Sequence, residues 1–330
     1  MTMAVRVFLV LALVVAGFFA PRILGGSPAV YSACVLIAIF AVMAYGLDMI
    51  VSDVGEVSLG QSLFFAAGAY TTALLSTGPK LGPIPAFCGS MAAAVVIAAL
   101  LGLVTLRLRE FVFSLVTYAV VVVAVTFAQN WSFLGGSDGL GGIPPFQLSF
   151  ATLSFTARND KELWPVAYLL VLVAIYLVHA FRRSRLGQAA LMVHLNPRLA
   201  TMSGINPQRT RLSVFMFSAP ITAAAGWLYA YQRAYVSADV LEVYFLILML
   251  TAVVLFGRGW LLGPLAGVSL ILVQEKFLSF GGDVDKIILG GVLIVTLTLL
   301  PRGLAGALQP ISTLAEAALY RFGNRMPKRS

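Results

Sequence analysis

Residues 182–211 read RRSRLGQAALMVHLNPRLATMSGINPQRTR, a polar and basic segment that lies between two long apolar ones. Its six basic residues are Arg182, Arg183, Arg185, Arg198, Arg209 and Arg211. In a membrane protein, the positive-inside rule holds a short basic loop on the cytoplasmic side. Leucines recur every four residues at 191, 195 and 199, which predicts a short amphipathic helix over 187–203. We interpret this helix as a docking surface for a soluble partner.

The rest of the chain is strongly apolar. Of the 330 residues, 60% are hydrophobic and 11% are charged, whereas soluble domains carry about 25% charged residues. We therefore expect an all-α polytopic membrane protein, with residues 1–330 forming one transmembrane domain. The net charge of +9 is explained by basic cytoplasmic loops, so we expect no nucleic-acid partner. Cys34 and Cys88 lie in apolar segments and are predicted to be small core residues.

Apolar runs long enough to cross a bilayer predict about ten transmembrane helices. The first run resembles a secretory signal peptide, but no small-x-small cleavage site follows it, which favours a retained span. The predicted spans are 5–20, 30–51, 57–77, 84–106, 111–131, 164–181, 212–232, 241–257, 260–278 and 285–301.

The distribution of basic residues agrees with a cytoplasmic position for 182–211. Alternation of the ten spans then puts both termini in the cytoplasm, including a tail at 302–330, and puts the loop 132–163 in the periplasm. Fifteen of the 22 lysines and arginines fall on the inner side of this topology. The loop begins with GGSDGLGG at 135–142, which predicts several glycines with positive φ and no folded domain. Small residues such as Gly68 and those at 223–226 predict close helix packing.

The residue inventory argues against an active site. The chain has no Gly-Lys dipeptide, so it lacks a phosphate-binding loop. Its only histidines are His179 and His194, too few for a histidine-based metal site or catalytic triad. His194 falls on the predicted amphipathic helix, where we expect it at the solvent edge. We therefore predict no metal site and no catalytic residues.

Three acids, Asp48, Asp53 and Glu56, gather where the second and third spans meet. They predict either a broken helix that faces a transport pathway, or a cytoplasmic turn with solvated acids. The pattern favours the turn for Asp53 and Glu56 and leaves Asp48 undecided.

A family resemblance covers most of the chain, from about residue 30 to 306. Residues 46–75, GLDMIVSDVGEVSLGQSLFFAAGAYTTALL, are similar to a block of the permease subunits of bacterial ATP-binding-cassette importers for branched-chain amino acids, above all the LivM-type subunit. The family pattern there is G-L-N, then G-x-x-S-L-G-H-x-x-F-F-x-x-G-A-Y-T. Further matching positions are Ser184, Gly187, Ala200, Gly204, Ile205, Asn206, Phe217, Ser218, Ala219, Ala225, Gly226, Gly263, Pro264, Gly267, Gly290, and Pro301 to Leu304.

Three departures from the family pattern stand out. Asp48 replaces the usual Asn, and Gln61 replaces the usual His. In the family's coupling helix, Ala-Ile-Arg-Glu-Asn-Glu is the usual sequence, whereas residues 192–197 here lack both acids.

The resemblance implies a permease subunit of the bacterial inner membrane, with a cytoplasmic coupling helix. Its implied partners are two ATPase subunits, which bind ATP and Mg²⁺, a second permease subunit, a periplasmic solute-binding protein and membrane lipid; no cofactor is expected in this chain. The implied ATPase-coupling residues are Ser184, Gly187, Leu191, Ala200, Gly204, Ile205 and Asn206. The predicted substrate-pathway residues are Asp48, Ser58, Gln61 and Tyr70.

Two other functions remain open at this point. An ion-coupled secondary transporter could use Asp48 as its coupling carboxylate. An intramembrane lipid-modifying enzyme is disfavoured by the residue inventory. Branched-chain amino acids are the family's solutes, and related small amino acids, amides, urea or small organic acids are alternatives.

Overall fold

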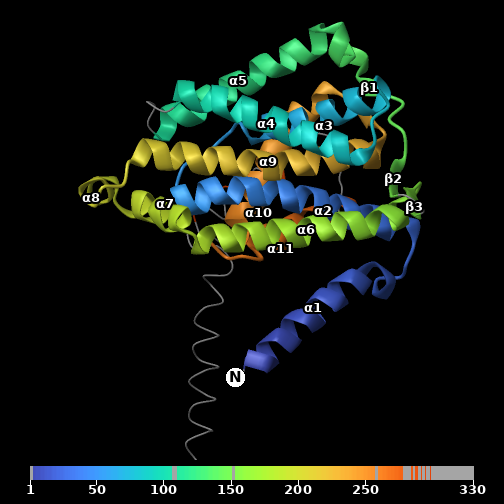
Figure 1. The fold of residues 1–330 in the computed structure, drawn as a ribbon, viewed down its shortest axis with the longest axis horizontal. Helices are drawn as coiled ribbons and strands as arrows, with labels where there is room; N and C mark the ends of the chain where they lie inside the picture. Colours follow the sequence, from blue (N-terminus) through green and yellow to red (C-terminus); the bar gives the residue numbers. More distant parts are fainter. Residues whose placement is uncertain are drawn as a thin grey trace, which may run out of the picture.

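The computed structural model describes residues 3–105, 110–150, 153–256 and 259–277, with single positions between 284 and 298. Long helices lie side by side along one axis (Figure 1). We call the end with α7 and α8 the arginine end, and the opposite end, with β2 and β3, the hairpin end. The helices are α1 (Met3–Ile23), α2 (Pro28–Asp48), α3 (Gln61–Thr77), α4 (Pro83–Thr105), α5 (Glu110–Asn130), α6 (Asp160–Arg183), α7 (Arg185–Leu195), α8 (Pro197–Met202), α9 (Pro207–Arg233), α10 (Val243–Phe256) and α11 (Gly263–Phe277).

Each of the first nine predicted spans falls on one helix. The largest displacement is at α9, which begins at Pro207 because Asn206 accepts a hydrogen bond from the backbone N–H of Arg209 and caps the helix. Within the described residues, five helices are long and apolar enough to cross a membrane: Pro28–Val54, Pro83–Leu103, Val112–Asn130, Asp160–Arg183 and Pro207–Arg233. The predicted tenth span, the turn at 257–258 and the tail 302–330 lie outside the continuously described residues.

The core of the bundle is formed by α2, α3 and α9. Gly68 on α3 lies against the backbone of Ala223 on α9, and Gly226 lies against the backbone of Phe65. A Cβ atom at either glycine would overlap a carbonyl group of the neighbouring helix. The predicted close packing is therefore confirmed at these positions. The core prediction is wrong for Cys88, which is exposed on α4 and not packed inside the bundle.

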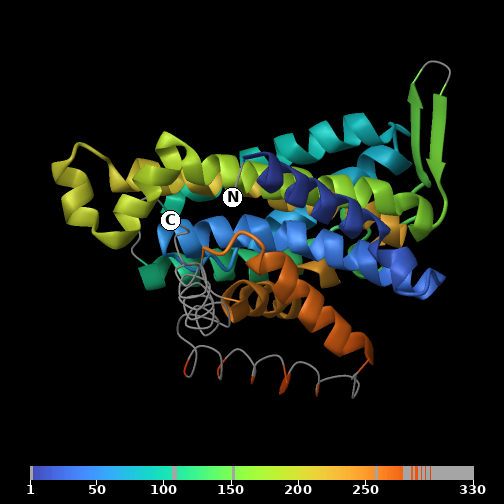
Figure 2. The same cartoon turned by 90° about the horizontal axis from the view of Figure 1, so that it is seen from below.

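The segment 132–163 contains strands that we did not predict. Strands β2 (Phe146–Phe150) and β3 (Leu153–Ala157) form an antiparallel hairpin, and β1 (Leu140–Gly141) pairs with β4 (Tyr235–Val236). Figure 2 shows the hairpin standing perpendicular to the helices. The overlooked signal is the alternation of apolar and polar residues along both strands. The predicted positive φ values are confirmed at Gly135, Gly136, Gly139 and Gly142.

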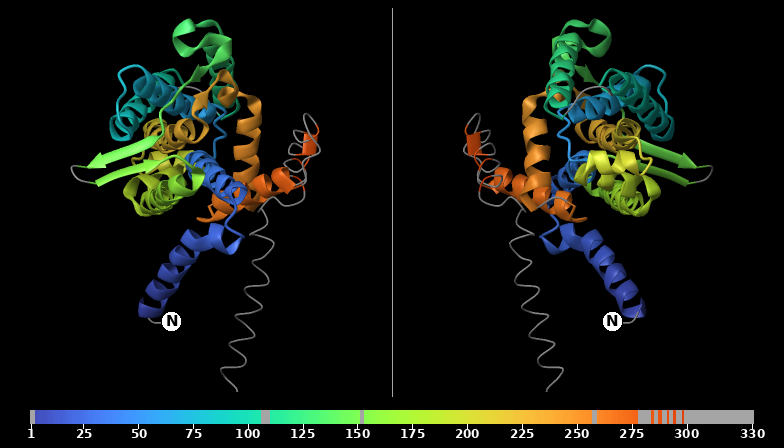
Figure 3. Two further views of the ribbon diagram at one scale, coloured as in Figure 1. Left: turned by 90° about the vertical axis from the view of Figure 1, so that its right-hand side faces the viewer. Right: turned by 90° about the vertical axis from the view of Figure 1, so that its left-hand side faces the viewer.

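The amphipathic helix predicted over 187–203 is two helices. It breaks at Asn196, whose backbone is extended, with φ −158° and ψ 98°. Proline at 197 disfavours a helical residue before it, and the Asn196 side chain accepts hydrogen bonds from the N–H groups of Arg198 and Leu199. Helix α1 runs along the outside of the bundle and contacts α6, because Trp164 and Tyr168 donate hydrogen bonds to the carbonyl groups of Phe18 and Val14. Viewed along the bundle in Figure 3, the β2–β3 hairpin extends away from α10 and α11.

Candidate functional site

Helix α2 widens into a π-helix, η1 (Met49–Val54), at the arginine end. Gly55 ends η1 with a left-handed φ of 82°, and its N–H donates to the carbonyl of Ile50. Short π-helical segments are frequent at functional sites because they redirect the side chains of one turn. The widened turn brings Asp48 and Asp53 to the same partner.

That partner is Arg182, in the last turn of α6. Its Nη2 lies 2.7 Å from Oδ2 of Asp48, and its Nε lies 3.1 Å from Oδ1 of Asp53. The Asp48 side chain is only 1% exposed and that of Asp53 13%. A buried carboxylate persists when a countercharge and hydrogen bonds satisfy it. We call Asp48, Asp53 and Arg182 the carboxylate–arginine cluster.

Ser52 extends this cluster to the loop before α11. Its hydroxyl donates to Oδ1 of Asp48 and accepts from the N–H of Gly259 at 3.0 Å. Nη1 of Arg182 donates to the carbonyl oxygen of the same glycine at 3.1 Å. The cluster therefore joins α2, η1, α6 and the α10–α11 connection.

Glu56 makes a second ion pair at the same end. Its Oε1 lies 3.0 Å from Nε of Arg211, on the first turns of α9, and the Glu56 side chain is 6% exposed. The interpretation of Asp53 and Glu56 as solvated acids of a turn is therefore wrong, because both acids are buried and each pairs with an arginine.

Helix α7 is seated on the end of η1 through His194. Its Nδ1 lies 3.1 Å from the carbonyl oxygen of Ser52, and its ring packs on Gly55. The ring is half-buried and hydrogen-bonded, which agrees with the expected position at the solvent edge, and it also forms a contact between α7 and η1.

Two of the predicted coupling residues shape the corner between α6 and α7. Ser184 caps α7 by accepting a hydrogen bond from the N–H of Gly187 at 3.2 Å. Gly187 lies against the backbone of Phe181 and Arg182, where a Cβ would overlap the Phe181 carbonyl.

The other predicted coupling residues lie on α7, on α8 and in the turn between α8 and α9. Ala200 is buried, and its carbonyl accepts from the N–H of Ile205. Gly204 is exposed and has a φ of 80°, a left-handed conformation that glycine commonly adopts just after the end of a helix. Asn206 caps α9, and Leu191 on α7 is exposed. Their part in ATPase coupling stays a prediction.

Exposed apolar side chains cover the outer surface of α7 and α8. Their exposed fractions run from 44% to 86%. We call this set the docking patch: Leu191, Met192, Leu195, Leu199 and Met202. The exposed arginines 185, 198 and 209 lie along the same segment. An exposed apolar surface with a charged rim is typical of a protein interaction site.

Gln61, one of the predicted pathway residues, holds three helices together. Nε2 of Gln61 donates to Ser218 on α9 at 3.1 Å and to the carbonyl of Gly46 on α2 at 3.4 Å. Its Oε1 accepts from the hydroxyl of Thr222 at 3.1 Å. Ser58 is fully buried in the segment before α3, where it accepts from the N–H of Gly60.

Tyr70, the third of these residues, lies in the middle of α3 and is 6% exposed. Within the described residues, its hydroxyl has no hydrogen-bond partner.

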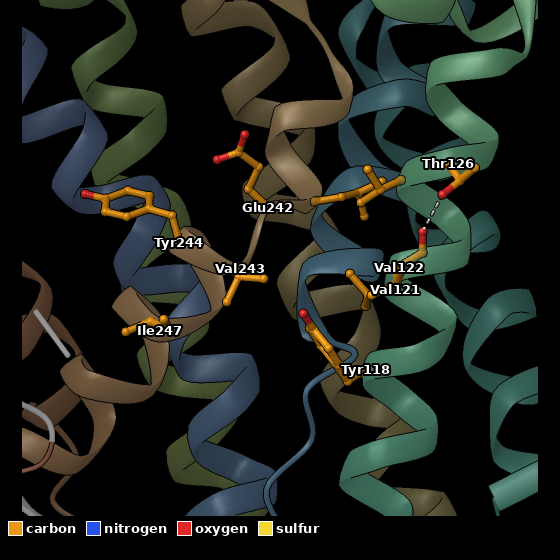
Figure 4. Close-up of a pocket in the computed structure, with 10 residues that line it drawn as sticks. Tyr118, Val121, Val122, Thr126, Glu242, Val243, Tyr244 and Ile247 are labelled. Atoms are coloured by element: carbon orange, nitrogen blue, oxygen red, sulfur yellow. Dashed lines mark hydrogen bonds between the residues drawn. The ribbon is translucent and has the colours of Figure 1, made fainter. Parts of the chain in front are cut away.

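A cavity of about 440 Å³ opens between α5 and the segment from η4 (Ala238–Leu241) into α10 (Figure 4). In Figure 4, Val121 on α5 lies across the gap from Val243, and the Tyr118 hydroxyl points into the gap. The ring of Tyr244 points away from α5. The lining is mainly aliphatic: Val121, Val122, Val125, Leu241, Val243 and Ile247, with Tyr118, Thr126, Glu242 and Tyr244 as its polar members.

Neither the cavity nor the carboxylate–arginine cluster has the composition of a metal site. Across the part of the chain that the structure describes, no three His, Cys, Asp or Glu side chains gather to hold an ion.

The comparison with known protein families is decisive. The family model described as "Branched-chain amino acid transport system / permease component" matches residues 30–297. The chain belongs to this permease family. It is a transport component and not an enzyme, so the intramembrane enzyme alternative is set aside. The predicted resemblance is confirmed.

Three individual relatives also support the assignment to a permease family. The chain is 29% identical to the high-affinity branched-chain amino acid transport system permease protein LivM of Escherichia coli (strain K12), over 86% of this chain and 71% of the relative. LivM of Salmonella typhimurium is also 29% identical, over 82% and 69%. The autoinducer 2 import system permease protein LsrD of E. coli (strain K12) is 24% identical, over 89% of each chain. No solved structure matches this chain.

Proposed function

We propose that this integral inner-membrane protein is the LivM-type permease subunit of an ATP-driven importer for branched-chain amino acids or related small amino acids and amides. The family supports an importer permease that works with ATPase and solute-binding subunits. The LivM relatives favour branched-chain amino acids, whereas the LsrD relative carries the name of a different solute. Because the chain belongs to a family of importer permeases that work with ATPase subunits, the ion-coupled secondary transporter is the weaker alternative.

The observation that carries the proposal is the docking patch. Leu195 and Met202 are 75% and 86% exposed at the basic end of the bundle, where lipid does not cover them. Exposed apolar side chains in water are costly, so a soluble partner is needed to cover them. We assign this partner as one of two ATPase subunits, which bind ATP and Mg²⁺.

Movement of α7 has a direct route into the bundle. His194 connects α7 to η1, and Arg182 connects the end of α6 to Asp48 on α2. These contacts are short and partly buried, so a displacement of α7 by the ATPase is transmitted to α2 and α6 as packed elements. Ser184, Gly187, Ala200, Gly204, Ile205 and Asn206 then act by shaping this segment, and Leu191 by contacting the ATPase.

The passage for the solute is proposed along the cavity between α5 and α10. Its valines and Ile247 match the size and polarity of branched aliphatic side chains. The cavity opens on the side of α5 and α10, so a second permease subunit that packs there would close it into a pore. In this proposal Asp48 and Gln61 act on the pathway through the helices that they join. Ser58 and Tyr70 act indirectly, because Ser58 is buried in the segment before α3 and Tyr70 is buried on α3, outside the lining of the cavity.

The proposed topology follows the charge distribution. Both termini and the docking patch lie in the cytoplasm, and the hairpin end faces the periplasm, where the solute-binding protein delivers its ligand.

Reconstitution tests this function. The permease, co-purified with its partner subunits, is placed in liposomes with ATP inside, and uptake of radiolabelled leucine is measured with the binding protein outside. We expect ATP-dependent uptake. Leu195→Ser should abolish most of it, whereas Ile23→Ser at the opposite end, where the exposed fraction is also 75%, should not. Uptake without ATP, or equal loss in both variants, contradicts the proposal.

A further inference from the structure

The β2–β3 hairpin has one apolar and one polar set of cross-strand pairs. Phe146 pairs with Ala157 and Leu148 with Phe155, whereas Gln147 pairs with Thr156. Residues two apart on a strand lie on the same face of the sheet, and directly paired residues share that face. The pairs Phe146–Ala157 and Leu148–Phe155 therefore form a single apolar face.

The contacts of Phe146 show which way this face is turned. Its ring lies 5.6 Å from that of Trp227 and 5.3 Å from that of Tyr231, measured between centroids. Both partners belong to α9 and precede its last residue, Arg233, so they lie on the bundle side of the helix end. The apolar face of the hairpin therefore faces the helix bundle, and not the solution beyond the ends of the helices.

The helix bundle covers the apolar face only near the base of the hairpin. Phe146 is 2% exposed at the base, Leu148 is half-buried, and Phe155 is 41% exposed. An isolated two-stranded hairpin is marginal in water, so the uncovered part of its apolar face needs another contact. Residues 146–157 contain no charged side chain, so no ionised group of the hairpin itself favours contact with water.

The neighbouring helices indicate what lies beneath this face. Strand β2 contacts α4 and β3 contacts α6. Both helices expose large apolar side chains in the half nearer the hairpin, Ile84 at 47% on α4 and Leu169 at 60% on α6. Figures 2 and 3 show the hairpin extending sideways past these helices, away from α10 and α11. The surface beneath the hairpin is therefore that of the lipid around α4 and α6.

The open edges of the strands limit how deep the hairpin can lie. In the described part of the chain, no further strand pairs with the backbone N–H and C=O groups of either edge, and these groups must remain hydrated. An apolar face together with wet edges fits the boundary between headgroups and acyl chains. Arg158 and Lys161, directly after β3, are suited to the phosphate level of that boundary.

We propose that the β2–β3 hairpin is a membrane-surface anchor, whose apolar face rests on the lipid leaflet at the hairpin end. It fixes the connection between α5 and α6 relative to the membrane while the other end of the bundle moves. The partner is a lipid surface and not a protein.

Spin labels on the two faces test this anchor. Phe155→Cys and Gln147→Cys are made separately in a chain in which Cys34 and Cys88 are replaced by alanine. Leu148→Cys gives a second position on the apolar face. Each permease is co-purified with its partner subunits and placed in bilayers, and leucine uptake confirms assembly. Collisions of the label with oxygen, which dissolves in lipid, and with a water-soluble nickel chelate are then measured.

The three possible environments have different signatures. On lipid, labels at 155 and 148 collide with oxygen and little with nickel, and their oxygen-to-nickel ratio exceeds that at 147 by about threefold or more. Equal nickel accessibility on both faces overturns the anchor. Low accessibility to both reagents at 155, or protection that appears only after the binding protein is added, indicates a protein partner and also overturns it.

Discussion

The ring of His194 fills the space that a side chain on Gly55 would need. A Cβ atom at Gly55 would lie 2.8 Å from Cδ2 of this ring. Gly55 also has a φ of 82°, which only glycine adopts at little cost. The docking helix α7 therefore touches the end of η1 at a backbone that has no side chain. We therefore expect a movement of α7 to be transmitted to η1 through this contact.

Gly55→Ala should separate the two. The positive φ costs an alanine about 1–2 kcal/mol, and the new methyl group also displaces His194. We expect a lower thermal unfolding midpoint of the purified permease and a loss of substrate-stimulated ATPase activity in the assembled complex.

Gly142→Ala is the matched control, because Gly142 has a φ of 77° and no atom within 4 Å of a built Cβ. It carries the strain without the displaced ring. The double variant Gly55→Ala/His194→Ala keeps the backbone strain of the positive φ but has no histidine ring for the new methyl group to displace. If Gly55→Ala and Gly142→Ala reduce ATPase stimulation equally, the contact with His194 has no part in coupling.

Arg182 should contribute much more to stability than its neighbour Arg183. One guanidinium serves two buried carboxylates, so Arg182→Gln leaves Asp48 and Asp53 without a countercharge. Breaking a buried ion pair in this way costs about 3–5 kcal/mol. Arg183 is exposed and pairs with no acid in the described part of the chain, so Arg183→Gln should change little. Thermal unfolding of the two purified variants measures the difference, and similar midpoints would refute the role of the cluster.

The sequence predicted the positions of the long apolar helices well because lipid imposes a simple rule. A helix that crosses a bilayer needs about 20 predominantly apolar residues, and such runs can be read without tertiary information. The predicted ends differ where local capping decides, as at Asn206 and Asn196. The hairpin was missed because its alternating pattern is short and follows a glycine-rich run.

The candidate site was less predictable. The three acids were recognised as unusual, but their partners lie far away in the chain: 134 residues separate Asp48 from Arg182. No local pattern encodes such a pair. From the sequence, Arg182 was interpreted only as one of the basic residues that hold the loop 182–211 on the cytoplasmic side. The cavity between α5 and α10 depends on how two helices pack, which neither helix specifies alone. The family resemblance, by contrast, was visible in residues 46–75 because several small and aromatic residues occur there at fixed spacing.

The orientation of the bundle is tested by labelling exposed positions at its two ends. Ser137 is exposed at the hairpin end and Ser203 at the arginine end. With Cys34 and Cys88 replaced by alanine, a membrane-impermeant maleimide should label Ser137→Cys in intact spheroplasts. It should label Ser203→Cys only after the membrane is broken. The reverse pattern would put the docking patch outside the cell and overturn the proposed topology.

Asp48 distinguishes the two transport mechanisms. An ion-coupled transporter needs a carboxylate that exchanges protons with water, but both oxygens of Asp48 are occupied, by Ser52 and by Arg182, and its side chain is 1% exposed. Asp48→Asn keeps the shape of the side chain, restores the residue that is usual in the family, and leaves Arg182 paired with Asp53 alone. We expect leucine uptake within about twofold of the unsubstituted importer, dependence on ATP, and a thermal midpoint that is unchanged or higher, because one buried charge has been removed. Uptake is measured with and without a proton gradient across the liposome membrane. A loss of about tenfold, equivalent to about 1.4 kcal/mol at one step, that appears only with the gradient would make Asp48 a coupling carboxylate and the secondary transporter the correct mechanism.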